Sequence, residues 1–210
     1  MITLPKNKNE ISTFQIPDEY LQKLIQYSNS QTFEDEHSSE NGVFHKQIRP
    51  NPNELGFNIE ELFQNGHNLD YRECKFDYLY PDEIASNEYL SVSRIPDITP
   101  TEEQRLDPLW ATLFWHADTY CDFNSYKCII YLNDVTKENG AISINKDRYV
   151  ANDNEYDGIR QKFEKLDEIP DDFIEGTAGT AVVFSCRILH RINVPKKGYR
   201  HAFHIEIKEK

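Results

Sequence analysis

The sequence predicts a mainly β fold, an antiparallel sandwich or barrel with helices near the N-terminus packed on its outer face. The chain of 210 residues is 38% hydrophobic and 12% aromatic, which is typical of a folded globular protein. From about residue 110 onward, short runs rich in β-branched and aromatic residues follow one another, with turn signals between them. The length suits one domain, with an N-terminal support over about 1–108 and a barrel core over about 109–210.

Helical patterns occur in the N-terminal part. Residues 17–28 (PDEYLQKLIQYS) carry apolar side chains at roughly helical spacing, after a proline and an aspartate that are typical of a helix start. Residues 58–66 (NIEELFQNG) predict a short helix closed by Gly66. Between these two helices, a polar loop is expected at 37–42 (HSSENG).

The remaining elements are strands and their connections. Alternating or β-branched runs predict strands at 74–80, 89–95, 110–118, 126–135, 140–144, 179–192 and 200–207. A polar, proline-punctuated connection at 97–108 precedes the strand-rich half. A turn is expected at 137–140 (KENG), and the stretch 193–199 (NVPKKGY) joins the last two strands. A helical insert at 156–166 (YDGIRQKFEKL) interrupts the strands.

Charge and cysteine usage narrow the class of protein. The formal net charge of −13 repels phosphate backbones, so we expect no nucleic-acid partner. The start (MITLPKNKNEIS) has no apolar stretch, and no run approaches bilayer length, so we expect neither a signal peptide nor a membrane span. The four cysteines form no CxxC pair, which disfavours a structural zinc site. A cytoplasmic protein is the simplest expectation, and no feature indicates an oligomeric state.

A candidate metal site begins at His116-Ala117-Asp118. Alternate side chains of a strand share a face, so His116 and Asp118 point the same way and offer two ligands from one strand. Such a triplet also arises by chance in many chains of this length. His190 ends a later strand, and Arg200 begins the next; in an antiparallel hairpin, the turn between them returns Arg200 to the neighbourhood of His190. Each histidine, taken alone, is as well explained by a core or surface position.

The combination points to a specific chemistry. Two histidines and one carboxylate form the facial triad of non-haem Fe(II) oxygenases, which leaves three metal positions open. An arginine is the expected partner of a carboxylate cosubstrate, because its fork makes two parallel charge-assisted hydrogen bonds.

Two long stretches carry a resemblance to a known family. The stretches WHADTYCDFNSYKCIIYLNDVTKENGAISI and GTAVVFSCRILHRINVPKKGYRHAF resemble the iron-binding half of the phytanoyl-CoA dioxygenase family, which belongs to the Fe(II)- and 2-oxoglutarate-dependent dioxygenases. The resemblance covers roughly the last half of the chain. It implies a double-stranded β-helix, a distorted jelly roll that is cupin-like, with the metal near one open end. It also implies that His116, Asp118 and His190 bind Fe(II), and that Arg200 binds the distal carboxylate of 2-oxoglutarate.

Further residues follow from the same resemblance or from their neighbourhood. Arg94, in YLSVSRIP, and Thr119, directly after the ligand pair, are candidate cosubstrate contacts, with a solvated arginine and an ordinary strand threonine as the alternatives. Trp115, Tyr131 and His204 are candidates for the wall of the substrate pocket, with a core role as the alternative for each.

The resemblance implies an activity and also shows two departures. Fe(II), 2-oxoglutarate and O2 would together hydroxylate an unactivated C–H bond of a small organic substrate, with release of succinate and CO2. Asp118 leaves no vacant position for a halide, so hydroxylation is favoured over halogenation. The sequence NKDRYV (145–150) replaces the family's proline-glycine-serine-histidine turn, so we expect a rebuilt lid, and Ile192 replaces a serine or threonine that assists the cosubstrate.

Two other functions remain open at this stage. The barrel could be a non-catalytic or cupin-like module that binds a metal or a small ligand. It could also be an interaction protein in which the motif is accidental, and such a protein would bind no metal.

Overall fold

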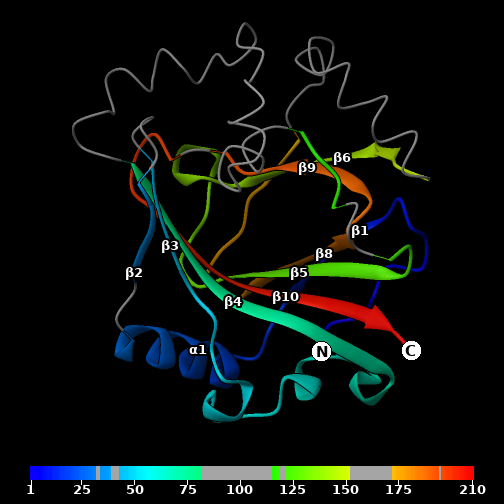
Figure 1. Cartoon of the computed structure of the whole chain (residues 1–210), viewed down its shortest axis with the longest axis horizontal. Helices are drawn as coiled ribbons and strands as arrows, with labels where there is room; N and C mark the ends of the chain where they lie inside the picture. Colours follow the sequence, from blue (N-terminus) through cyan, green and yellow to red (C-terminus); the bar gives the residue numbers. More distant parts are fainter. Residues whose placement is uncertain (32–33, 39–42, 82–114, 119–121, 152–171, 194) are drawn as a thin grey trace, which may run out of the picture.

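Two antiparallel sheets form the framework of the protein. A computed structural model describes residues 1–31, 34–38, 43–81, 115–118, 122–151, 172–193 and 195–210. Within this part, seven strands form a large sheet in the order β1-β8-β5-β10-β4-β3-β2, and three form a small sheet in the order β7-β6-β9. Figure 1 shows the small sheet on one side of the large sheet and helix α1 on the other. The mainly β fold with an N-terminal helix on its outer face is therefore confirmed.

The elements follow one another along the chain with short connections where both ends are described. The strands are β1 (Ile11–Gln15), β2 (Glu34–Ser38), β3 (Val43–Ile48), β4 (Leu69–Pro81), β5 (Ser125–Tyr131), β6 (Ile142–Tyr149), β7 (Phe173–Ile174), β8 (Thr180–Ser185), β9 (Ile188–Arg191) and β10 (Arg200–Glu209). The helices are α1 (Asp18–Ser30) and the 3₁₀ turns η1 (Pro52–Glu54), η2 (Ile59–Leu62), η3 (Gly66–Asn68) and η4 (Lys137–Asn139). No helix in the described part of the chain is both long and apolar enough to cross a membrane.

Strand β5 shows how the sequence builds two hydrophobic cores. Cys128 and Ile130 point to the core beneath the large sheet, which α1 covers with Leu21 and Leu24. Ile129 and Tyr131 point to the other core, between the two sheets. Because alternate side chains of a strand face opposite sides, one apolar run supplies both cores, and the sheet is buried on both faces.

Several expected elements differ in the structure. The segment 58–66 forms a 3₁₀ turn at Ile59–Leu62, and Gly66 begins η3 instead of closing a helix, so that expectation was wrong. A Cβ at Gly66 would lie 2.2 Å from the carbonyl oxygen of Glu60, which explains why glycine stands there. Residues 145–149 extend β6 as a strand. The expected elements at 89–95, 97–108 and 156–166, and the first five residues of 110–118, lie outside the described residues.

A buried hydrogen bond ties α1 to the large sheet. Ser28, in the last turns of α1, has its hydroxyl 2.7 Å from Nε2 of His201 on β10. His201 is only 8% exposed. Its ring also packs edge-on against Tyr78 of β4, at 5.4 Å between ring centroids. The position of the helix is therefore fixed by an imidazole as well as by apolar packing.

This histidine predicts a loss of stability in mild acid. Burial lowers the pKa of His201 from its usual 6.5 to about 4, so the unfolded chain takes up the proton first as the pH falls. The neutral imidazole contributes fully above about pH 6.5, and we expect a loss of about 2–3 kcal/mol between pH 7 and pH 4.5. Urea unfolding at the two pH values measures it. His201→Gln should lose less stability than the wild type over this interval; an equal loss would contradict the assignment.

Candidate active site

Three side chains with metal-ligating atoms converge beside β9. His116, Asp118 and His190 each offer one ligand atom, and these atoms lie within 4.8 Å of one another. His190 belongs to β9, and His116 forms an isolated antiparallel bridge with it, in which each backbone N–H donates to the carbonyl of the other residue. The N–H of Asp118 donates to the carbonyl of Cys186, in the turn before β9. The backbone therefore brings the two halves of the predicted triad together.

The spacing of these atoms suits a metal ion. Nε2 of His116 lies 3.8 Å from Oδ1 of Asp118, and Nε2 of His190 lies 3.6 Å from Oδ2 of Asp118. Ligand atoms at about 2.1 Å from a metal are separated by about 3–3.5 Å, so small side-chain movements close the set. Two imidazoles and one carboxylate are also the donor set of Fe(II) sites with open positions. The three residues therefore fit an iron ion.

His190 is held in the form that binds metals. Its Nδ1 lies 2.8 Å from the carbonyl oxygen of Ile188, which can only accept, so Nδ1 carries the proton and Nε2 presents a lone pair to the site. Burial holds the pKa of His190 well below its usual value, so the ring is neutral at pH 7. The ring of Phe184 on β8 packs edge-on against it, at 5.0 Å between centroids.

A lysine lies among the three candidate ligands. The ammonium of Lys127, on β5, is 2.5 Å from Oδ2 of Asp118 and 3.4 Å from Nε2 of His190. Burial alone would raise the pKa of Asp118, but Lys127 and the two neighbouring histidines together hold this pKa well below its usual value. Asp118 is therefore charged, and the large sheet supplies a cation at the position where the triad offers its ligand atoms.

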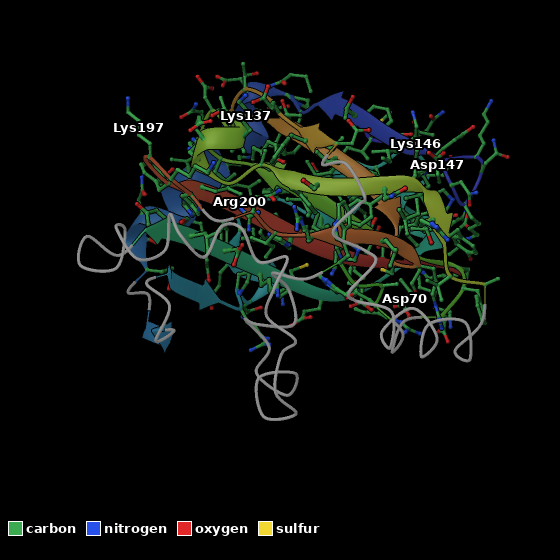
Figure 2. The ribbon with its side chains drawn as sticks, turned by 90° about the horizontal axis from the view of Figure 1, so that it is seen from above. Asp70, Lys137, Lys146, Asp147, Lys197 and Arg200 are labelled. Atoms are coloured by element: carbon green, nitrogen blue, oxygen red, sulfur yellow. The ribbon has the colours of Figure 1, made fainter. Side chains whose placement is uncertain are left out.

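Arg200 is engaged in a different buried ion pair. Its Nη2 lies 2.5 Å from Oδ2 of Asp77 on β4, and its Nη1 donates to the carbonyl of Gly140 at 3.1 Å. Arg200 and Asp77 are 0% and 1% exposed. Figure 2 shows Arg200 over the central strands, whereas Lys146 and Asp147 lie toward one end of the molecule.

Strand pairing changes the relation between Arg200 and His190. Strand β10 pairs with β4 and β5 in the large sheet, whereas β9 pairs with β6 in the small sheet. The expected hairpin between the strands of His190 and Arg200 was therefore wrong. The two residues instead lie on sheets that face each other.

The inner face of the large sheet carries a row of polar side chains. We call the following residues of β4, β5 and β10 the inner polar row: Lys75, Asp77, Lys127, Arg200 and His204. Nε2 of His204 lies 3.4 Å from Oδ2 of Asp77, and burial lowers the pKa of His204 to about 4, so this ring is neutral at pH 7. His204 and Lys75 are direct partners in the pairing of β10 with β4.

The other predicted site residues are placed as follows. The hydroxyl of Tyr131 donates to the carbonyl of Ile174 at 2.7 Å, so it links the two sheets, and burial raises its pKa to about 12. Trp115 is 3% exposed, its Nε1 has no hydrogen-bond partner among the described residues, and the guanidinium of Arg191 lies 5.1 Å from its ring. Arg94 and Thr119 lie outside the described residues.

Sequence reasoning missed Lys75, Asp77 and Lys127. Each is a charged residue at an alternate position of a strand whose neighbouring positions are apolar. This alternation normally indicates a face in contact with solvent. For Lys127, the sequence did contain a signal of burial. The other side chains of the stretch YKCIIY are apolar, and the lysine stands where a core residue is expected.

Solved structures with a similar fold include enzymes that depend on 2-oxoglutarate. The non-heme alpha ketoglutarate dependent carbocyclase SnoK from nogalamycin biosynthesis matches with a TM-score of 0.58 and 14% identity, over 98% of this chain and 84% of that one. The epimerase SnoN from the same biosynthesis matches with a TM-score of 0.55 and 10% identity, over 94% and 77%. HygX from Streptomyces hygroscopicus, with nickel and 2-oxoglutarate bound, matches with a TM-score of 0.53 and 9% identity, over 95% and 83%.

At these identities the likeness shows a shared fold, the double-stranded β-helix that was predicted. No protein-family model matches the sequence, and no curated protein matches it. The resemblance to the phytanoyl-CoA dioxygenase family is therefore not confirmed at the level of the family.

Proposed function

We propose that this protein is an Fe(II)- and 2-oxoglutarate-dependent dioxygenase that oxidises a C–H bond of a small organic molecule. The observation that carries the proposal is the convergence of His116, Asp118 and His190 on one point, inside a fold shared with 2-oxoglutarate-dependent enzymes. Hydroxylation is the outcome we favour. Because the similar structures include a carbocyclase and an epimerase, the same oxidation of a C–H bond could also end in ring closure or inversion.

Different residues of the chain would bind the metal, orient its ligands and exclude water. Iron, when bound, would use O2 to convert 2-oxoglutarate to succinate and CO2 and would oxidise the substrate. His116, Asp118 and His190 would hold it on one side, since three ligands from a single side leave the opposite positions to cosubstrate and O2. The Ile188 carbonyl keeps His190 oriented. Phe184, which is buried and packs edge-on against the ring of His190, would exclude water from that ligand.

Succinate release tests this proposal. The purified protein is incubated in air with Fe(II), 2-oxoglutarate and a panel of small candidate substrates, and succinate is quantified. Asp118→Ala should abolish succinate formation, because it removes the charged ligand. Asp147→Ala is the matched control, since the side chain of Asp147 is exposed on β6 and is not one of the three candidate ligands. Failure of the wild type to bind Fe(II) would refute the proposal.

A second function has an observation of its own. Lys127 supplies a cation to the triad, and Asp77 neutralises Arg200, so the barrel could bind a metal or small ligand without catalysis. A ligand that binds only the folded state must raise its thermal stability. Metal binding with no effect of 2-oxoglutarate on the melting temperature would favour this second function.

A further inference from the structure

The buried ion pair of Arg200 bears on how a cosubstrate would be bound. A carboxylate is best held by two parallel hydrogen bonds from a guanidinium. In this protein one terminal nitrogen of Arg200 pairs with Asp77 and the other donates to Gly140, which leaves only Nε without a partner among the described residues. An incoming carboxylate would meet the charge of Asp77 and find a single N–H. Arg200 is therefore poorly suited to hold the distal end of 2-oxoglutarate.

Lys75 is the cation of the inner polar row that has no such partner. Lys127 pairs with Asp118, and Arg200 pairs with Asp77. Lys75 makes no hydrogen bond or ion pair with any residue that the structure describes. Glu73, the carboxylate two residues before it, pairs with Arg49 at 2.9 Å. The inner polar row thus has three cations and one carboxylate, Asp77, and Asp118 lies outside the row against Lys127. Lys75 is the cation of the row that is left without an ion pair among the described residues.

Strand pairing places Lys75 closer to the triad than Arg200. Lys127, which touches Asp118, is the direct partner of Glu206 on β10. Lys75 is the partner of His204, two residues from that point, or about 7 Å along the strand. Arg200 is six residues from the same point, or about 20 Å at about 3.3 Å per residue. The distal carboxylate of a short 2-oxo acid chelated at the triad would therefore reach Lys75 and not Arg200.

We propose that the ammonium of Lys75, and not the guanidinium of Arg200, binds the distal carboxylate of the 2-oxo acid cosubstrate. The proposal rests on the proposed function, since it assumes a metal-bound 2-oxo acid. Burial lowers the pKa of Lys75, and attraction to Asp77 offsets part of this. A carboxylate beside the ammonium supplies the missing counter-charge. Arg200 then acts as a structural residue that fixes Asp77 and, through it, His204.

Binding of two 2-oxo acids to metal-loaded protein tests the proposal. Calorimetry under anaerobic conditions, with Fe(II) present, compares 2-oxoglutarate with 2-oxobutyrate, which has the same chelating end but no distal carboxylate. Lys75→Met should weaken 2-oxoglutarate about 10- to 100-fold, as expected for the loss of a charged hydrogen bond, and leave 2-oxobutyrate unchanged. Lys75→Arg should retain most of the affinity. Lys146→Met, at an exposed lysine of β6, is the matched control.

The outcomes separate this proposal from the function on which it rests. If the wild type binds Fe(II) and 2-oxoglutarate, and Lys75→Met binds 2-oxoglutarate equally well, the role of Lys75 is refuted and the proposed function stands. If the wild type binds neither Fe(II) nor any 2-oxo acid, both fail. A melting curve of each metal-free variant shows that it folds. Lys75→Met should melt no lower than the wild type, because it removes a half-buried charge that has no ion pair among the described residues.

Discussion

Asp118→Asn is expected to abolish metal binding and to destabilise the metal-free protein by about 3 kcal/mol. The metal effect follows from the loss of the charged ligand; even changes outside the ligand set cost about 10–100-fold in metal affinity, so we expect a larger loss here. The stability effect follows from Lys127, whose ammonium lies 2.5 Å from Asp118. Asparagine removes the carboxylate in contact with that ammonium, whose side chain is only 18% exposed, and breaking a buried pair from one side costs about 3–5 kcal/mol.

A double-mutant cycle isolates the pair. Lys127→Met should also lower the stability of the metal-free protein, because Asp118 then lacks its cation. The double variant Asp118→Asn, Lys127→Met should recover most of the stability and none of the metal binding. Urea unfolding gives the free energies, and calorimetry with Mn²⁺ or Co²⁺ gives the metal affinity.

The same cycle shows whether Lys127 competes with the metal. A metal ion must displace the ammonium to reach Asp118, so Lys127→Met should bind metal about 10-fold more tightly or better. If Lys127→Met binds metal more weakly than the wild type, the ammonium supports the site instead of occupying it. In that case the contact between Lys127 and Asp118 would no longer favour the second function, a binding protein without catalysis.

Asp77→Asn is expected to be the most destabilising single change on β4, by about 3–5 kcal/mol. Arg200 and Asp77 are both fully buried, so the variant leaves a guanidinium charge in the interior with no carboxylate. Arg200→Met should cost a similar amount, and the double variant should be more stable than either single variant. Urea unfolding of the metal-free protein measures all three.

A surface aspartate provides the matched control. Asp122 pairs with Arg72 at 2.8 Å and its side chain is 49% exposed, so Asp122→Asn should cost less than about 1 kcal/mol. If Asp77→Asn costs no more than Asp122→Asn, the ion pair with Arg200 is not a buried structural element. Arg200 would then be free of a structural ion pair and available to a cosubstrate.

The sequence identified those parts of the fold in which periodicity and burial agree. The apolar stretches 126–135 and 179–192 became β5, β8 and β9, because their side chains fill the cores on both faces of the large sheet. Strands β2 and β3 were not predicted. They lie at the edge of the large sheet and have polar sequences, EDEHS and VFHKQI. Strand β2 pairs with β3, and β3 pairs with β4, a long-range pairing that has no local signal in the sequence.

The candidate site divides in the same way. The triad could be predicted from the sequence for two reasons. Few residue types can act as metal ligands, and His116 and Asp118 are close in sequence. The inner polar row could not be predicted from the sequence. Lys75 and Asp77 alternate with apolar residues, which is also the pattern of a strand with one face in solvent. Only the second sheet, which covers this face, turns their charges inward. The hairpin between β9 and β10 failed for a related reason, since a short connection does not reveal that the chain changes sheets.

The distribution of the site over two sheets has a consequence for engineering. The candidate metal ligands are tied to β9 and the turn before it, whereas Lys75, the proposed contact of the cosubstrate, stands on β4. Residues more than about 7–10 Å apart with no shared partner usually contribute additively. Under the proposed function, substitutions on β4 would alter the choice of oxo acid more than the choice of metal. Libraries built on β4 would then explore new cosubstrates while His116, Asp118 and His190 stay unchanged.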